Sequence, residues 1–205
     1  MKLFGERRIE DLFLNLESNI KSYVAARRDN VLKKDIETVA NEIYHLIKIR
    51  TTLRLDKKGT TVKTIMKSLP TNRIPYDARM FATKESYEFA CVNYLIPFEG
   101  NGDLFAYQPR KHSGHTYEGN LRKNSLLIEL QTQSVSEKLN EKVEIEVTNM
   151  INQVVEKIEE NIAKVNTECE SYNEILKTKI IKAIEDYIKD DNDRKKQEDR
   201  LNPFK

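Results

Sequence analysis

The chain lacks the long hydrophobic run that a membrane-spanning helix requires. None of its 205 residues belong to a stretch of roughly eighteen consecutive apolar residues, which is the usual mark of such a span. The first residues, MKLFGERRIEDLF, carry charges where a signal peptide would have its apolar segment. We therefore expect a cytoplasmic protein with no membrane partner.

Cysteine is scarce, and neither sign of charge is in large excess. Cys91 and Cys169 stand far apart, one in a strand-like run and one in a helical run, which indicates small core residues in a reducing compartment and not a disulfide framework. Lysine and arginine number 35 against 33 aspartate and glutamate residues, which excludes a global field that attracts nucleic acid or anionic lipid. Any such site must be local.

Familiar catalytic and nucleotide-binding motifs are also missing. The sequence has no G-K-[ST] loop, no G-x-S-x-G elbow and no C-x-x-C pair. The segment EGNGD, residues 99–103, lacks the G-x-G-x-x-G pattern, so we interpret it as a turn. Glu156, Glu159 and Glu160 lie among lysines on a predicted helix and are expected to face water. The sequence therefore predicts no enzyme, no catalytic residue and no cofactor.

Charged helical sequence dominates what is present, since charged residues make up 33% of the chain. Apolar residues recur every three or four positions from Ile9 to Val24 and again from Leu32 to Ile47. This spacing places one apolar stripe on each of two helices. It predicts a helical hairpin over residues 1–50.

The same spacing returns in the last third of the chain. Apolar stripes from Leu139 to Val165 and from Tyr172 to Ile188 predict long helices over residues 135–190. We expect these helices to pair with the N-terminal ones, as a helical bundle or a coiled-coil-like stalk, or to self-associate into an oligomer. The charged tail, residues 191–205, is expected to be solvated or frayed.

The central region, residues 51–134, has the alternation and the aromatic content of β-structure. Two alternating runs around the turn DKKG predict a β-hairpin, and residues 70–86, which contain prolines, predict an irregular connection. Three further strands are predicted. The first lies in YEFACVNYLIPF, where Pro97 marks the strand's end, or an edge position, near the EGNGD turn. The second begins at Leu104 and stops at Pro109, and the third runs from about Leu126 to Thr132. The expected fold is thus α+β, with a small antiparallel β-sheet flanked by long amphipathic N- and C-terminal helices.

Two sets of central residues are candidate binding residues. Buried aromatic side chains dominate interface energetics, so Phe98, Leu104, Phe105 and Tyr107 are candidate anchors for a partner protein, with a place in the core as the alternative. Arg110, Lys111, His112, His115, Arg122 and Lys123 form a basic loop region that could bind nucleic acid or a nucleotide, with a solvated loop as the alternative.

The pair His112 and His115 also has zinc-ligand spacing. A tetrahedral zinc site needs a third and usually a fourth ligand, and no cysteine lies near in sequence. A metal-dependent enzyme at these histidines is the third hypothesis, and no metal is expected.

Several short motifs resemble a bacterial module. Pro97-Phe98-Glu99-Gly100, Asp103-Leu104-Phe105 and Pro109, followed by a long helix with a break at Tyr172-Asn173, are similar to an uncharacterised helix–sheet–helix module. That module stands amino-terminal to effector domains such as TIR in antiphage-defence proteins. The basic loop departs from the module, which has Ser, Thr and Pro there. The resemblance implies a sensor or scaffold that works with a separate effector in antiviral defence, and it transfers no catalytic residue.

Overall fold

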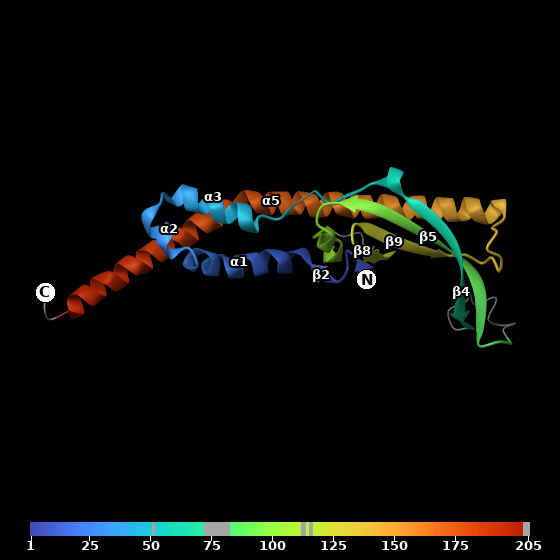
Figure 1. The fold of residues 1–205 in the computed structure, drawn as a ribbon, viewed down its shortest axis with the longest axis horizontal. Helices are drawn as coiled ribbons and strands as arrows, with labels where there is room; N and C mark the ends of the chain where they lie inside the picture. Colours follow the sequence, from blue (N-terminus) through green and yellow to red (C-terminus); the bar gives the residue numbers. More distant parts are fainter. Residues whose placement is uncertain (51, 72–82, 112–113, 115–116, 203–205) are drawn as a thin grey trace. The chain divides into compact units, whose positions relative to one another are not determined.

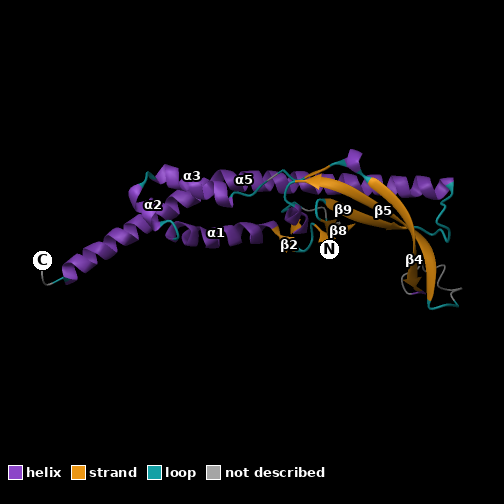
Figure 2. Cartoon of the chain, in the orientation of Figure 1, coloured by secondary structure: helices purple, strands orange, loops and turns teal. Residues whose placement is uncertain are grey.

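The computed structural model describes residues 1–50, 52–71, 83–111, 114 and 117–202. These residues form an α+β protein, as expected, whose helices and strands are distinguished in Figure 2. The chain divides into two compact units. Unit 1 contains Met1–Glu6 and Thr52–Lys164, and unit 2 contains Arg7–Thr51 and Val165–Lys205. None of the described helices combines the length and the apolar character needed to cross a bilayer.

Unit 1 is built around the long strand β5, Ser86–Glu99, which is light green in Figure 1. On one side β5 pairs antiparallel with β9, Ser125–Gln131, and β9 in turn pairs with β8, Asn120–Arg122. On the other side β5 pairs antiparallel with both β3, Arg54–Leu55, and β4, Thr61–Pro70. The antiparallel sheet and the strand predicted near Leu126 to Thr132 are therefore confirmed.

The predicted hairpin between β3 and β4 is wrong, because the two strands do not pair with each other. Leu55 lies opposite Phe98 and Thr61 lies opposite Leu95, so both strands run in the same direction along one side of β5. Between them the chain forms the 3₁₀ helix η1, Lys57–Gly59, whose Lys58 and Gly59 N–H groups donate to the Asp56 carboxylate. This cap lets the chain bulge outward and then resume its path along β5 without reversing.

Pro97 lies two residues before the end of its strand, which the sequence predicted near the EGNGD turn, but it does not hold an edge position, because both neighbours of β5 reach it. β5 continues to Glu99, and the Pro97 carbonyl accepts a hydrogen bond of 2.8 Å from the Asp56 N–H. A proline lacks only the donor, so its carbonyl still takes part in the pairing. The residues predicted to lie outside strands at 70–86 fall mostly on 72–82, which lie outside the described residues.

The strand predicted to begin at Leu104 is also wrong. Gly100 turns the chain with φ +93°, and a Cβ atom there would lie 2.4 Å from the Thr52 carbonyl oxygen. The Asn101 side chain then accepts from the Asp103 N–H and starts the 3₁₀ helix η3, Gly102–Ala106. Leu104 and Phe105 therefore lie in η3, and only Tyr107–Gln108 form a strand, β6.

The first residues of the chain complete the core of unit 1. Strand β1, Lys2–Leu3, pairs antiparallel with β7, Tyr117–Glu118. The Phe4 N–H donates to the Phe105 carbonyl at 2.6 Å, and the two rings lie 5.8 Å apart. Phe105 in turn meets the Phe98 ring edge-to-face at 5.2 Å. Three buried aromatic rings thus join the chain's start, β5 and η3.

Unit 2 is a helical bundle. After the two-residue strand β2, Arg7–Arg8, the chain forms α1, Ile9–Ala25, the short α2, Arg28–Lys33, and α3, Ile36–Ile47. The expected pairing of N-terminal helices with the C-terminal segment is present, since Phe13 of α1 stacks on Tyr172 of α5 and the Ile49 carbonyl, just after α3, accepts from Asn173 of α5. The red end of α5 continues past these helices in Figure 1. The apolar spacing did not predict α2 as a separate helix. The Asp35 carboxylate accepts from the Thr38 N–H and begins α3.

The last helix, α5, runs without interruption from Glu141 to Leu201 and contains 61 residues. The Val143 N–H donates to the Asn140 side chain at its start. Its buried residues recur every three or four positions and largely match the predicted stripe, although Met150, placed on the stripe, is 48% exposed. The buried members are Val147, Ile151, Val155, Ile158, Ile162, Val165, Cys169, Tyr172, Leu176, Ile180 and Ile184.

The resemblance suggested a break at Tyr172-Asn173, but α5 is continuous there and through the predicted tail. Tail residues 192–202 are solvated, as expected, and 192–201 are helical rather than frayed. Asp191 explains part of this order. Its side chain is only 4% exposed and forms ion pairs with Arg28 of α2 and with Arg194 and Lys195 of the next helical turn.

Candidate interaction surfaces

Strand β4 presents an open edge in unit 1. It pairs with β5 over ten residues, from Thr61 opposite Leu95 to Pro70 opposite Ser86, and no described strand pairs with its other edge. Val62 is 57% exposed, while Ile65 and Met66 are half-buried. An open strand edge offers unpaired N–H and C=O groups to another extended chain.

The β4–β5 pair also extends past the rest of the sheet. β9 ends at Gln131 opposite Cys91, whereas β5 begins five residues earlier at Ser86. We call residues 66–70 and 86–90 the β4–β5 arm (Figure 1). Leu69 and Phe89 form a small apolar cluster of their own in this arm, with Tyr87 packed against them. This apolar cluster therefore packs the two strands of the arm together where β9 does not pair with them.

Lysines make the β4 edge positive. Lys63 and Lys67 lie four residues apart, so both side chains project from one face of the strand. Lys67 pairs with Glu129 of β9, and Lys63 has no ion pair with any residue that the structure describes. Antiparallel pairing of two β4 strands about Ile65 would set Lys63 of one copy against Lys67 of the other. This like-charge opposition disfavours self-pairing through β4.

The candidate anchors from the sequence lie inside unit 1. Phe98, Leu104 and Phe105 are buried, which is the alternative that the sequence left open, and Tyr107 is half-buried. They build the core at the junction of β5 and η3. Aromatic residues that cluster near a turn are equally typical of a core and of an interface, and sequence alone does not separate the two cases.

The basic residues come from two turns. Arg110 and Lys111 follow β6, while Arg122 ends β8 and Lys123 occupies the β8–β9 turn with φ +45°. All four side chains are exposed. His112 and His115 lie outside the described residues, so the predicted basic set and the histidine pair are placed only in part.

The titratable groups whose pKa values are shifted are at least partly buried or held by hydrogen bonds and ion pairs. Burial raises the pKa of the Cys169 thiol to about 12, and it also raises the pKa of the Cys91 thiol, so both stay protonated near neutral pH. Glu159 pairs with Lys57 of η1, and a hydrogen bond from Lys157 lowers the pKa of Glu160. Over the described ranges of the chain, no three His, Cys, Asp or Glu side chains are grouped as a metal site requires.

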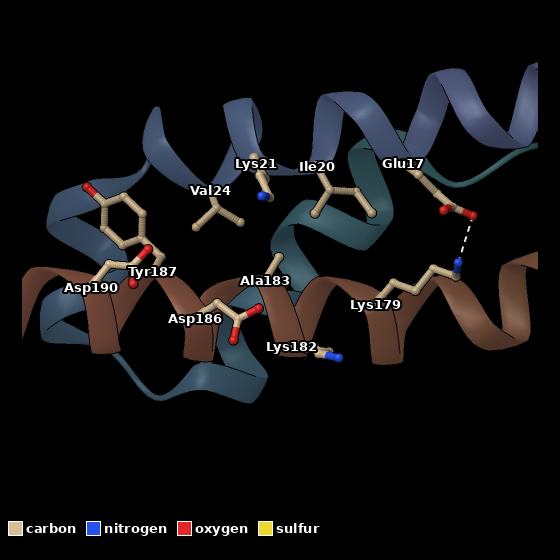
Figure 3. A pocket seen from close by; sticks show the side chains of 10 residues that line it. All are labelled: Glu17, Ile20, Lys21, Val24, Lys179, Lys182, Ala183, Asp186, Tyr187 and Asp190. Carbon is tan, nitrogen blue, oxygen red and sulfur yellow. Dashed lines mark hydrogen bonds and ion pairs between the residues drawn. The ribbon is translucent and has the colours of Figure 1, made fainter.

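Unit 2 contains a groove between α1 and α5 with a volume of about 410 Å³ (Figure 3). Ile20 and Val24 reach into it from α1, and Ala183 faces them from α5. The Glu17 carboxylate and the Lys179 ammonium group close one end with an ion pair of 2.7 Å. Its walls are formed by Glu17, Ile20, Lys21, Val24, Lys179, Lys182, Ala183, Asp186, Tyr187 and Asp190. We call this feature the α1–α5 groove.

Charges on α5 are ordered along this groove. Lys179 and Lys182 precede Asp186 and Asp190 on one face of the helix. Among the described residues, Lys182, Asp186 and Asp190 take part in no ion pair. Their sequence pattern did not mark these residues as a site, because each is an ordinary charged helix residue. The one available signal was the pair of aspartates four residues apart, which an isolated helix disfavours.

Comparisons with known proteins identify no relative. No protein-family model matches the chain, and the searches of curated proteins and of solved structures found no match either.

Proposed function

We propose that this chain is a non-enzymatic interaction subunit that binds an extended segment of a partner protein along β4. The observation that carries the proposal is the open, ten-residue edge of β4. An extended segment adds to such an edge through main-chain hydrogen bonds, and its alternate side chains give specificity. The perturbed groups described above serve packing and ion pairs, which is why we assign no catalytic role.

The chemistry of β4 defines the kind of segment that would fit. Lys63, Ile65 and Lys67 project from one face of the strand. A partner strand with acidic residues flanking an apolar residue would place carboxylates near the lysines and the apolar side chain near Ile65. Such a segment fits a separate effector protein for which this chain acts as sensor or scaffold, in keeping with the resemblance to a defence module.

We place this action in the cytoplasm. Cys91 and Cys169 are both buried as free thiols. Free buried thiols are typical of proteins in a reducing compartment. Cys91 is buried in strand β5, and Cys169 is buried in the apolar stripe of α5.

The test uses proteins encoded next to this chain, purified with it one by one. We expect a 1:1 complex with one of them, which Lys63→Glu weakens and Lys58→Glu, in exposed η1, leaves unchanged. Backbone amides of β4 should exchange more slowly in the complex. Failure of every neighbour to bind, or binding that Lys63→Glu and Lys58→Glu affect equally, overturns the proposal.

A second candidate is nucleic-acid binding through Arg110, Lys111, Arg122 and Lys123, with His112 and His115. What favours it is the exposure of the four described cations and the lack of an ion pair between Lys111, Arg122 or Lys123 and any described residue. Binding of a labelled single-stranded oligonucleotide should fall steeply with salt and drop in the Arg122→Ala/Lys123→Ala variant. Binding that ignores both changes rejects it.

A further inference from the structure

We infer that the α1–α5 groove is a self-association surface at which two copies of this chain dock antiparallel, with Lys182 of each copy facing Asp186 of the other. The inference rests on unit 2 alone and is independent of β4 and its partner. It concerns residues to which the proposed function assigns no role.

The order of charges along α5 selects this partner. Along one face, two cations, Lys179 and Lys182, are followed by two anions, Asp186 and Asp190. A two-fold axis near Ile184 reverses this order in the second copy and sets cations against anions. A parallel arrangement sets like charges together. Because a two-fold contact is isologous, each Lys182–Asp186 contact occurs twice.

The contacts inside unit 2 leave these charges available. Glu17 already holds Lys179 at 2.7 Å, but no ion pair joins Lys182 and Asp186, although they lie four residues apart on one helix. Asp186 and Asp190 stand one turn apart with like charge. Cations from a second copy relieve this repulsion, which gives the association a favourable term that the single copy lacks.

The groove also suits the close approach of another helix. Ala183 has a small side chain at the centre of the charged face, and small residues let helix backbones pack closely. Ile20 and Val24 give the groove an apolar floor, and half-buried Tyr187 stands on its rim. Ile175, on the same face one turn before Lys179, is 50% exposed and extends the apolar contact.

Sedimentation equilibrium of the full chain tests the inference. We expect a monomer–dimer equilibrium whose dissociation constant rises with salt. Asp186→Lys alone and Lys182→Asp alone each make both symmetric contacts repulsive, so each should weaken the dimer by at least about tenfold. An equimolar mixture of the two variants restores opposite charges at both contacts and should recover the dimer.

A matched control separates this contact from general charge effects. Glu185→Lys makes the same change of charge at an exposed residue of α5 that does not line the groove, and it should leave the dimer intact. Circular dichroism checks that each variant keeps its helices. A wild-type chain that stays monomeric at every concentration overturns the inference. So does a mixture that fails to recover the dimer, or a control that weakens it equally.

Discussion

The side-chain amide of Asn173 forms two hydrogen bonds with the main chain of Ile49. The Ile49 N–H donates to Asn173 Oδ1 at 3.0 Å, and Asn173 Nδ2 donates to the Ile49 carbonyl at 2.8 Å. One residue of α5 thereby completes the hydrogen bonding of a residue beyond the end of α3, 124 positions away in sequence. A single amide thus ties two distant segments of unit 2 together.

Replacement of this amide by a carboxylate should destabilise unit 2. Asn173→Asp removes the donor and points an anion at the Ile49 carbonyl, with an expected cost of about 1–3 kcal/mol. The free energy of unfolding from urea denaturation, followed by circular dichroism, measures the effect. Asn152→Asp, on an exposed face of the same helix, should change it little. Equal effects of the two variants would remove the special role of Asn173.

Tyr172 should govern part of the alkaline stability. Its ring stacks on Phe13 at 4.2 Å and its hydroxyl donates to the Phe13 carbonyl at 3.1 Å. Burial, and then the Glu17 charge, raise the pKa of Tyr172 above the ordinary value of 10.0. The folded state therefore holds the proton while the unfolded state releases it, so stability is full below about pH 10 and falls as the pH rises further.

Tyr172→Phe should show both consequences. Near neutral pH it loses one buried hydrogen bond, worth about 1 kcal/mol. Above pH 10 its stability should fall less steeply than that of the wild type, because phenylalanine has no proton to lose. Denaturant unfolding at several pH values measures both effects. Tyr23→Phe, at a more exposed ring on α1, is the control and should follow the wild type at every pH.

Gly100 should tolerate no side chain. Its φ of +93° is unfavourable for other residues, and a Cβ atom would lie 2.4 Å from the Thr52 carbonyl oxygen. Gly100→Ala should therefore cost well over the 1–2 kcal/mol of the left-handed conformation alone. Gly114 has φ +80° but open space around it, so Gly114→Ala isolates the conformational cost. Thermal unfolding ranks the two variants, and equal costs would contradict the steric argument.

Asp191 should make unit 2 sensitive to acid. The hydrogen bond from Lys195, with the charges of Arg28 and Arg194, lowers the pKa of Asp191 below its ordinary value of 3.8. A lowered folded pKa stabilises the protein above the unfolded pKa, and this contribution is lost as the pH falls through the folded value. Asp191→Asn should therefore be destabilising near neutral pH, with the difference from wild type vanishing in acid.

The control for this prediction is another aspartate of α5. Asp193 is exposed and lies 3.8 Å from Lys196, so Asp193→Asn should have little effect at any pH. Unfolding by denaturant across the acid range compares the two variants. A difference for Asp191→Asn that persists unchanged at low pH would mean that packing, and not charge, is responsible.

Periodicity predicted the helical segments well and the strand pairing poorly. The three-four spacing from Tyr172 to Ile184 marks the buried side of α5 because a helix stripe depends only on local geometry. By contrast, the alternation in β3 and β4 does not say which strand each one pairs with. The Asp56 cap of η1 decides that both align with β5, and such a cap depends on the tertiary path of the chain.

The candidate surfaces show the same division. Phe98 and Phe105 carried the strongest local signal, yet their rings meet at 5.2 Å in the core because Gly100 folds η3 back onto β5. The α1–α5 groove combines Ile20 with Ala183, whose helices lie at opposite ends of the sequence. Residues that converge only through tertiary packing leave no pattern in a single sequence.

Phe13 and Tyr172, which stack in unit 2, also determine when unit 2 can fold during synthesis on the ribosome. The atoms that bond them belong to residues 159 positions apart. At a synthesis rate of about 5–20 residues per second, α1 emerges roughly 8–32 seconds before the segment that covers it. Through that interval the apolar side of α1 has no native cover from α5, so nascent chains should engage a holding chaperone until the segment around Tyr172 has emerged.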